Sequence, residues 1–215
     1  QASDENPTFP PFLTGKKLLT SQTFRDLFRT EVIEGTEGLS VKDLTILFTD
    51  LKGSTAMYDR IGDLKAFSLV RQHFESLGKV INKFEGATVK TIGDAIMATF
   101  INPIDGVQAA LGMLEEIANF NKAFSNKEII LKIGVHKRPS IAVTLNERLD
   151  YFGQTVNIAS RVQGLADADE IYISEYVYDN NSVRDILKSY NITESKAKLR
   201  GIEDEMKVYK IVANV

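Results

Sequence analysis

The sequence predicts an α+β fold, and the order of its hydrophobic patterns carries that prediction. Apolar runs of strand length alternate with two long amphipathic helical patterns, in the order strand, helix, hairpin, helix, strand. Shorter strand patterns follow this unit. The βαββαβ order is that of a ferredoxin-like core, here with additional C-terminal strands. A chain of 215 residues fits one such domain with an appendage better than it fits two domains.

Composition narrows the function classes. The hydrophobic content of 43% and the charged content of 26% are ordinary for a globular protein. A net charge of −3 gives no electrostatic reason to expect nucleic acid as a partner. The absence of cysteine excludes disulfides, thiolate metal sites and a cysteine nucleophile, and it fits a cytoplasmic location. No apolar run approaches the roughly 18 residues that span a bilayer, so we expect no membrane contact from this part.

Residues 1–40 are predicted to be a linker with one short amphipathic helix. Residues 1–12 are polar and rich in proline, which predicts an extended lead-in. Apolar residues recur at helical spacing from Phe24, after the capping signal Thr20-Ser21. This helix packs either on the domain that follows, residues 41–215, or on a domain upstream. Because the chain begins at Gln1, we expect it to be part of a longer protein with an upstream regulatory domain.

The first predicted strand, Lys42 to Phe48, leads into a carboxylate and a turn. Asp50 lies at the strand end, and Gly53-Ser54-Thr55 can cap a helix whose free N–H groups face the same place. A carboxylate beside such amides suggests a metal-bound nucleotide. The alternative is that Asp50 only caps the helix. The helical pattern then runs to Phe84 with a break near Gly62.

The second carboxylate favours the metal interpretation. Two alternating apolar runs between Ala87 and Phe100 flank Gly93-Asp94, which is typical of a β-hairpin with Asp94 at its tip. If the hairpin lies beside the first strand, Asp50 and Asp94 converge into a site for Mg²⁺ or Mn²⁺. His73, in the preceding helix, is expected at the surface or at its boundary, without a chemical role.

The second half supplies a helix with two polar residues on one face. A helix is predicted from Pro103 to about Phe120, then a strand from Ile129 to Val135, with Ile141 to Leu145 as its hairpin return. A helix from Thr155 to Leu165 carries Asn157 and Arg161, which are four residues apart. Taken alone, these two residues are more simply explained as a surface amide and a surface salt-bridge arginine.

The predicted strands after this helix complete the sheet. They are Glu170 to Ser174, Ile192 to Leu199 and Met206 to Val212, with Arg200-Gly201 between the last two.

Three segments resemble the class III adenylate and guanylate cyclase catalytic domain of bacterial type. They begin at Leu47-Phe48-Thr49-Asp50, at Val89-Lys90-Thr91-Ile92-Gly93-Asp94 and at Asp150-Tyr151-Phe152-Gly153, the last continuing through Asn157 to Arg161. Their order and spacing are compatible with that family over residues 42–212. The resemblance implies a head-to-tail homodimer in which both partners build each active site. A monomer would be inactive.

The resemblance also implies a role for each residue. Asp50 and Asp94 would hold two divalent cations, Mg²⁺ or Mn²⁺, in one protomer, while the other supplies the rest of the site. The ribose 3′-oxygen attacks the α-phosphorus and expels pyrophosphate, so the guanidinium of Arg161 would stabilise the developing charge. Asn157 would orient the ribose. Arg200, with Lys198 beside it, stands near the position where the family more often has a phosphate-binding lysine.

Base choice follows from hydrogen-bond polarity. The carboxylate of Asp150 accepts from adenine N6, and Lys90 donates to adenine N1, so the pair favours ATP. Guanine would bring its N1–H against Lys90, at a cost on the order of 1–3 kcal/mol per unpaired buried group. A guanylate cyclase, or one that also takes pyrimidine nucleotides, is the first alternative, and a non-catalytic nucleotide-binding dimerisation module is the second. A diguanylate cyclase or polymerase palm is the third, although the Gly-Gly-acid-acid-Phe hairpin of a diguanylate cyclase is absent.

Two departures from the family pattern lie in one region. The usual His-x-Gly is His136-Lys137-Arg138 here, followed by Pro139, and glycines often found a few residues later are replaced by Thr144-Leu145. If the position of Arg138 requires a positive φ, the hairpin must be rearranged. We therefore expect changes in dimer affinity and regulation more than in chemistry.

Overall fold

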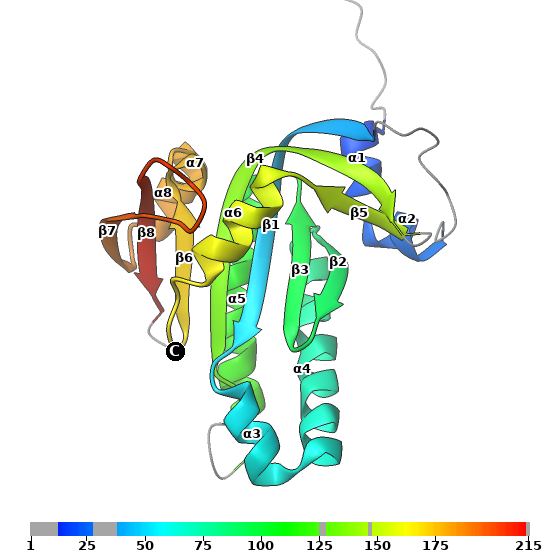
Figure 1. Cartoon of the computed structure of the whole chain (residues 1–215), viewed down its shortest axis with the longest axis vertical. Helices are drawn as coiled ribbons and strands as arrows, with labels where there is room; N and C mark the ends of the chain where they lie inside the picture. The colour runs from blue at the N-terminus through cyan, green and yellow to red at the C-terminus, as the bar shows by residue number, and fades with distance from the viewer. Residues whose placement is uncertain (1–12, 28–37, 125–127, 146–147, 214–215) are drawn as a thin grey trace, which may run out of the picture.

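The computed structural model describes residues 13–27, 38–124, 128–145 and 148–213, which form an α+β domain (Figure 1). The strands are β1 Leu39–Leu51, β2 Ala87–Ile92, β3 Ala95–Phe100, β4 Leu131–Leu145, β5 Arg148–Phe152, β6 Glu170–Ser174, β7 Asn191–Ala197 and β8 Met206–Val212. The helices are α1 Gly15–Leu19, α2 Gln22–Leu27, α3 Ser54–Ile61, α4 Asp63–Lys83, α5 Pro103–Asn121, α6 Gln154–Gln163, α7 Glu175–Tyr178 and α8 Asn181–Leu187.

One sheet contains all of these strands, and its order confirms the predicted fold. The path is β2-β3-β1-β4-β6-β8-β7, and β5 pairs with the far end of β4. The first four strands are antiparallel neighbours, joined by two helical crossovers, which is the ferredoxin-like arrangement. β6 adds to β4 in parallel, and β8 and β7 follow as the predicted extra strands.

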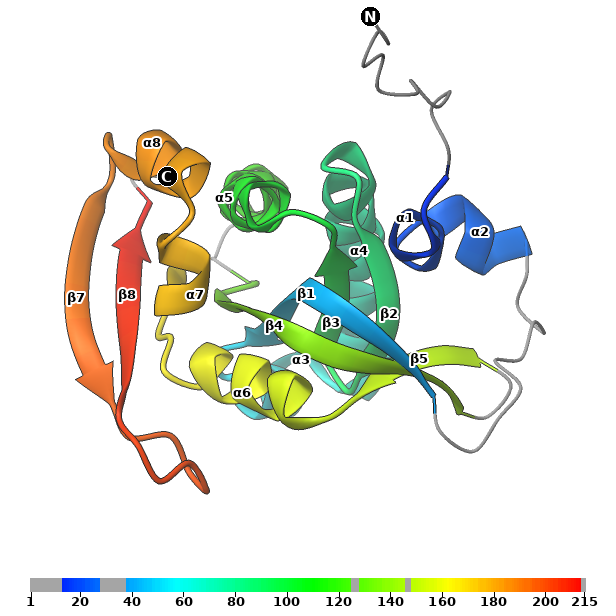
Figure 2. The ribbon, with the colours of Figure 1, turned by 90° about the horizontal axis from the view of Figure 1, so that it is seen from above.

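Each face of the sheet carries different helices (Figure 2). Helices α4 and α5 cover one face, where Leu47 and Leu51 belong to the main buried core. Helix α6 lies on the opposite face, and there Leu44, Ile46 and Phe48 belong to a second buried cluster. This alternation along β1 follows the two-residue period of a strand. The sheet is therefore buried on both faces along its middle.

The predicted hairpin return at Ile141 to Leu145 is wrong, because β4 runs without a break from Leu131 to Leu145 and β5 forms the return. Pro139 has no N–H to donate to a neighbouring strand. Opposite this part of β4, the partner strand β1 has a bulge between Val41 and Leu44, where Asp43 has a φ of 55°.

The cation at Arg138 lies within β4, where it pairs with Leu44 at the edge of the β1 bulge. Arg138 does not have a positive φ. Its guanidinium lies 4.0 Å from the centre of the Tyr176 ring. The condition of a positive φ, under which the hairpin would have to be rearranged, is therefore not met.

The helical segment before β1 packs on the domain that follows it, which answers the question that the sequence left open. Ser21 caps α2, since its Oγ accepts from the N–H of Phe24 at 3.4 Å. Leu19 is buried in the same cluster as Phe48 and Tyr151. The predictions for residues 1–12 lie outside the described residues.

His73 contradicts its prediction. It is fully buried in α4, among the apolar residues of that helix, rather than at the surface or its boundary. Burial lowers the pKa of His73 to about 4, so the imidazole is neutral near pH 7.

Among the described helices, none is long and apolar enough to cross a bilayer.

Candidate active site

Asp50 and Asp94 lie at the same end of the sheet. β1 pairs with β3 up to Phe48 and Met97, and Thr49 Oγ1 accepts from Ile96 N at 3.0 Å. Asp50 is the next residue of β1, so it lies beside the hairpin turn that carries Asp94. Within the described residues, the Oδ2 atom of Asp94 is buried without a hydrogen-bond partner. Such an oxygen is costly unless something binds it.

A lysine that the sequence analysis missed lies against the first carboxylate. Lys132 Nζ is 2.7 Å from Asp50 Oδ2, across the β1–β4 ladder. The alternation of apolar and polar residues along β4 could have indicated the position of Lys132. Leu131 and Ile133 point into the main core, so Lys132 must point to the opposite face of the sheet. The end of β1 thus carries two carboxylates and one cation.

The turn after Asp50 differs in detail from its prediction. Gly53, with a φ of 74°, is the capping residue of α3, and Ser54 is the first residue of the helix. No side chain caps this helix. The first backbone N–H groups of α3 have no carbonyl within the helix to bind and therefore remain available near Asp50.

Lys90 and Asp150 form the predicted pair. Lys90 Nζ lies 2.6 Å from Asp150 Oδ2, so strands β2 and β5 place a donor and an acceptor side by side. Asp150 is 8% exposed, and its Oδ1 accepts from the N–H of Tyr151 at 2.7 Å. The backbone thus fixes the carboxylate, and the ammonium group meets it from the neighbouring strand.

Helix α6 holds Asn157 and Arg161 at fixed height above β4. Gly134 of β4 makes this close approach possible, since a Cβ there would overlap the backbone of Gln163. Thr155 Oγ1 donates to Pro139 O and ties the start of the helix to the same strand. Asn157 is exposed, and Arg161 is half-buried.

Arg161 lies against the turn before β8. A Cβ on Gly201, whose φ is 72°, would be 3.4 Å from Arg161 Nη2. Arg200, the neighbouring residue, is exposed, as is Lys198. The structure therefore brings Arg161 and the Arg200-Gly201 turn together.

The predicted site residues form three groups within one chain. The first is Asp50, Asp94 and Lys132, the second is Lys90 with Asp150, and the third is Asn157, Arg161 and the Arg200 turn. Across the described residues, no hydrogen bond or ion pair links one group to another. A single protomer therefore carries all the parts without closing them into one site.

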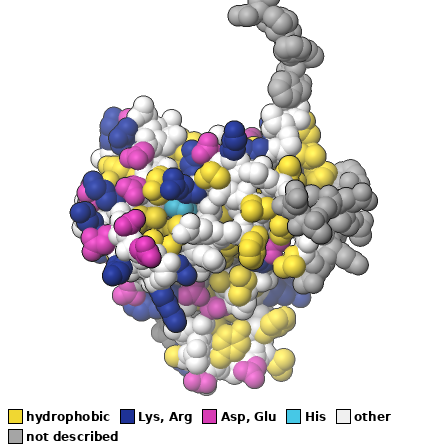
Figure 3. Space-filling view, turned by 45° about the horizontal axis from the view of Figure 1, so that its top comes forward, with side chains coloured by type: hydrophobic (Ala, Val, Ile, Leu, Met, Phe, Trp, Pro, Cys, Tyr) yellow, Lys and Arg dark blue, Asp and Glu magenta, His cyan; other side chains and the backbone are white. Residues whose placement is uncertain are grey.

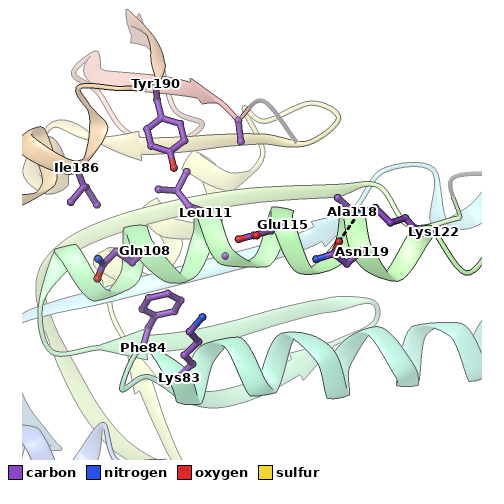
Figure 4. A pocket seen from close by; sticks show the side chains of 12 residues that line it. Lys83, Phe84, Gln108, Leu111, Glu115, Ala118, Asn119, Lys122, Ile186 and Tyr190 are labelled. Carbon is purple, nitrogen blue, oxygen red and sulfur yellow. Dashed lines mark hydrogen bonds between the residues drawn. The ribbon is translucent and has the colours of Figure 1, made fainter.

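A cavity lies away from these three groups. It measures about 630 Å³ and is bordered by α4, α5 and α8, with Phe84, Leu111 and Tyr190 among its lining residues (Figure 4). None of the predicted site residues lines it.

Comparison with known proteins gives a family match over most of the chain. Residues 38–213 match the family model described as the adenylate and guanylate cyclase catalytic domain. An adenylate cyclase of Anabaena cylindrica is 30% identical over 189 residues, which is 81% of this chain and 38% of that protein. Guanylate cyclase 32E of Drosophila melanogaster is 29% identical over 147 residues, 63% of this chain and 13% of that protein. The chain thus spans well under half the length of these curated relatives.

Solved structures agree on the fold. The adenylyl cyclase CyaB from P. aeruginosa superposes with a TM-score of 0.70 at 20% identity, covering 83% of this chain and 97% of that chain. The guanylyl cyclase Cya2 superposes with a TM-score of 0.72 at 17% identity, covering 83% and 96%. Both adenylate and guanylate cyclases therefore share this architecture.

Proposed function

The chain belongs to the adenylate and guanylate cyclase catalytic-domain family, and from this premise we propose that it is an adenylate cyclase. It converts ATP to 3′,5′-cyclic AMP and pyrophosphate, which makes it a phosphorus–oxygen lyase. The observation that carries the choice of ATP is the preformed pair of Lys90 and Asp150. Similarity to guanylate cyclase 32E keeps GTP as the second candidate substrate.

Asp50 and Asp94 are the residues that would hold two divalent cations. Carboxylate oxygens are the ligands that Mg²⁺ and Mn²⁺ prefer, and the unpartnered Asp94 Oδ2 supports a cation at this end of the sheet. When bound, the cations would lower the pKa of the ribose 3′-hydroxyl and neutralise phosphate charge. The N–H groups at the start of α3 add donors for phosphate oxygens at the same end.

Lys132 is proposed as a charge that exchanges partners. In the structure its ammonium group neutralises Asp50. If Asp50 held a cation, Lys132 would no longer be needed to neutralise this carboxylate and could pair with a phosphate of the nucleotide.

The third group supplies transition-state stabilisation. Arg161 presents a fork of N–H donors to the α-phosphate oxygens, where negative charge grows as the 3′-oxygen attacks. Asn157, on the same face of α6, holds the ribose in the attacking orientation. Arg200 binds the terminal phosphates and the departing pyrophosphate.

Adenine recognition rests on the order of donor and acceptor. The carboxylate of Asp150, held by the N–H of Tyr151, accepts from the N6 amino group. Lys90 donates to N1 from the neighbouring strand. Guanine would place its N1–H donor against the ammonium group, which leaves two donors facing each other and weakens binding.

A head-to-tail homodimer closes the site. One protomer would contribute Asp50, Asp94 and Lys132, and the other the remaining groups. Hydrophobic side chains are exposed on and beside the β4–β5 arm, which supports a contact with a second copy. They are Leu39, Ile141, Leu145 and Phe152, with exposed fractions of 48%, 39%, 56% and 70%. In the space-filling view, charged side chains gather on the β7–β8 side, and several hydrophobic ones lie toward the middle and right of this face (Figure 3).

The proposed setting is the cytoplasm, where ATP is abundant and a cysteine-free chain needs no oxidising compartment. Residues 1–40 would then link residues 41–215, the catalytic domain, to an upstream regulatory domain of a longer protein. Neither nucleic acid nor a membrane is needed for the proposed reaction.

The test is cyclic nucleotide formation by the purified chain at high protein concentration. ATP and GTP are supplied in parallel, each with Mg²⁺ or Mn²⁺, and the products are separated by chromatography. We expect cyclic AMP from ATP, abolished by Asp50→Ala and by Asp94→Ala. Arg71→Gln, at an exposed residue of α4, is the matched control and should retain activity.

Each of the other outcomes would contradict a different part of the proposal. Preferential formation of cyclic GMP would overturn the base-recognition role of Lys90 and Asp150 while keeping the cyclase reaction. Product formation that survives Asp94→Ala would overturn the metal site. If no nucleotide is cyclised by a chain shown to be dimeric by sedimentation, the domain is a nucleotide-binding module and not an enzyme.

A further inference from the structure

Helix α2 is tied to both strands of the base-recognition pair by a single side chain. Arg25 Nη2 donates to Leu149 O of β5 at 2.5 Å and to Val89 O of β2 at 3.4 Å. Gln22 reinforces the contact, since its Oε1 accepts from Thr88 N at 2.9 Å. In Figure 1, α1 and α2 stand beside β5 and the neighbouring end of β2.

These carbonyls lie next to the groups that would recognise the base. Val89 precedes Lys90, and Leu149 precedes Asp150. The residue after Asp150 is held as well, because Tyr151 Oη donates to Leu19 O of α1 at 3.2 Å. Asp150 is therefore flanked on both sides by contacts to the helical segment of residues 13–27.

The sheet itself does not fix the distance between Lys90 and Asp150. β2 pairs with β3, and β5 pairs with β4, so no ladder of hydrogen bonds joins β2 to β5. Apart from the Lys90–Asp150 ion pair, Arg25 is the described side chain that hydrogen-bonds to both strands. Removing it would leave the two strands joined only through the Lys90–Asp150 ion pair and through the separate contacts of Gln22 and Leu19, which would let β5 shift more easily relative to β2.

The surroundings of Arg25 restrict the movement of its side chain. The side chain is half-buried, and its Nη1 has no hydrogen-bond partner in the described part of the chain. Burial lowers the pKa of Arg25, while Tyr151, Asp150 and Asp26 oppose that change. A desolvated guanidinium is stable here because two carbonyls and the Asp150 carboxylate offset the cost of burial.

We propose that Arg25 is a positioning residue that sets the spacing of Lys90 and Asp150, and that the helical segment of residues 13–27 thereby controls nucleotide selectivity. The inference rests on the proposed role of Lys90 and Asp150 in base recognition. Arg25 would not touch the substrate. A domain upstream that pulls on α2 would then change affinity for the base without contacting the active site.

The experiment compares Arg25→Gln, Arg25→Lys and the control Arg71→Gln in the full chain. Arg71 is exposed on α4 and pairs only with Glu75 of the same helix among the described residues. For each variant, kcat and KM are measured with ATP and with GTP, and thermal unfolding reports folding. Hydrogen exchange of residues 87–92 and 148–152 reports the two strands without reference to activity.

We expect Arg25→Gln to lower the ratio of kcat/KM for ATP to that for GTP by about tenfold, mainly through KM for ATP. Exchange should rise in both strands. Arg25→Lys keeps the charge but has no planar fork of donors, so it should show a smaller change in the same direction. Arg71→Gln should match the wild type.

Two results would overturn the inference. The first is an ATP to GTP ratio that stays within about twofold of the wild type in both Arg25 variants. The second is unchanged exchange in residues 148–152. If Arg25→Gln does not fold, Arg25→Lys decides alone by the same criteria. A wild-type chain that cyclises neither nucleotide would instead refute the proposed function, and the exchange measurement would still judge the positioning role.

Discussion

Gly201 lies against the arginine that is proposed to act on the transition state. Its φ of 72° favours glycine, and a Cβ there would lie 3.4 Å from Arg161 Nη2. That distance is an ordinary van der Waals contact. A methyl group would therefore fit beside the guanidinium, whereas a longer side chain would compete with it for space.

We predict that Gly201→Leu lowers kcat by about tenfold with little change in KM, because the side-chain atoms beyond Cβ would displace Arg161, which is proposed to act on the transition state. The control is Gly62→Leu, which has a similar φ of 79° but nothing within 4 Å of the added Cβ. Both variants place a side chain at a positive φ, and only the first places it against the guanidinium. Equal kcat values for the two would contradict the prediction. Steady-state kinetics with ATP checks it.

At the scale of elements, the contact between α6 and β4 decides where Asn157 and Arg161 stand. Gly134 lets the two backbones approach closely, and a Cβ there would overlap Gln163. Helix α6 also completes the second buried cluster through Ala159. The height of the helix above the sheet is thus a property of two elements and not of either alone.

We predict that Gly134→Ala destabilises the fold by about 3 kcal/mol, because the overlap is with backbone atoms that cannot rotate away. Gly78→Ala is the control, since it lies inside α4 with nothing within 4 Å of the added Cβ. That control should stabilise the protein by about 0.5–1 kcal/mol. Urea unfolding followed by circular dichroism measures both. A stable Gly134→Ala variant would show that α6 can shift at little cost.

Considered as a whole, the molecule buries both of its histidines. His73 lies in α4 and His136 in β4, and burial lowers the pKa of each from 6.5 to about 4. His136 Nδ1 lies 2.8 Å from Ser174 Oγ, and Arg138 opposes its protonation. In the unfolded chain both side chains titrate near pH 6.5.

The direction of the pH effect follows from these values. Between pH 4 and pH 6.5 the unfolded chain binds more protons than the folded one, so stability falls as pH falls through this window. We predict a loss of about 1.5 kcal/mol per histidine between pH 6.5 and pH 5. His73→Leu should roughly halve the slope, because it removes one of the two histidines that titrate differently in the folded and unfolded chains. Urea unfolding at several pH values tests this, and an unchanged slope would contradict it.

Whole-molecule organisation also predicts how inactive variants combine. Asp50→Ala and Arg161→Ala impair different groups, which a head-to-tail dimer would draw from different protomers. A mixture should regain about a quarter of wild-type activity, because half of the dimers are mixed and one of their two sites is intact. Asp50→Ala mixed with Asp94→Ala should stay inactive, because both changes fall in the same group. Activity in that control, or none in the first mixture, would contradict a shared site.

The sequence by itself determined the fold class and the order of the main elements. The apolar run of β1, the Gly93-Asp94 turn and the long apolar faces of α4 and α5 are local patterns, so they can be read from neighbouring residues. The ends of β1 and β4, and the elements α1 and β5, were not predicted. The sequence also singled out Lys90 and Asp150, which the structure brings together although they are 60 residues apart. The prediction for His73 failed because the burial of a helix residue depends on which elements pack against that helix. The predicted hairpin return failed because β4 continues through Pro139, opposite a bulge in β1.

Only the tertiary structure decided the partners of the remaining residues. Lys132 meets Asp50 across a strand ladder, Arg161 lies against Gly201 from a different element, and Arg25 reaches two strands more than 60 residues away. Each of these contacts depends on the register and spacing of elements far apart in the chain. Such distances are set by the packing of the whole core, which no local pattern contains.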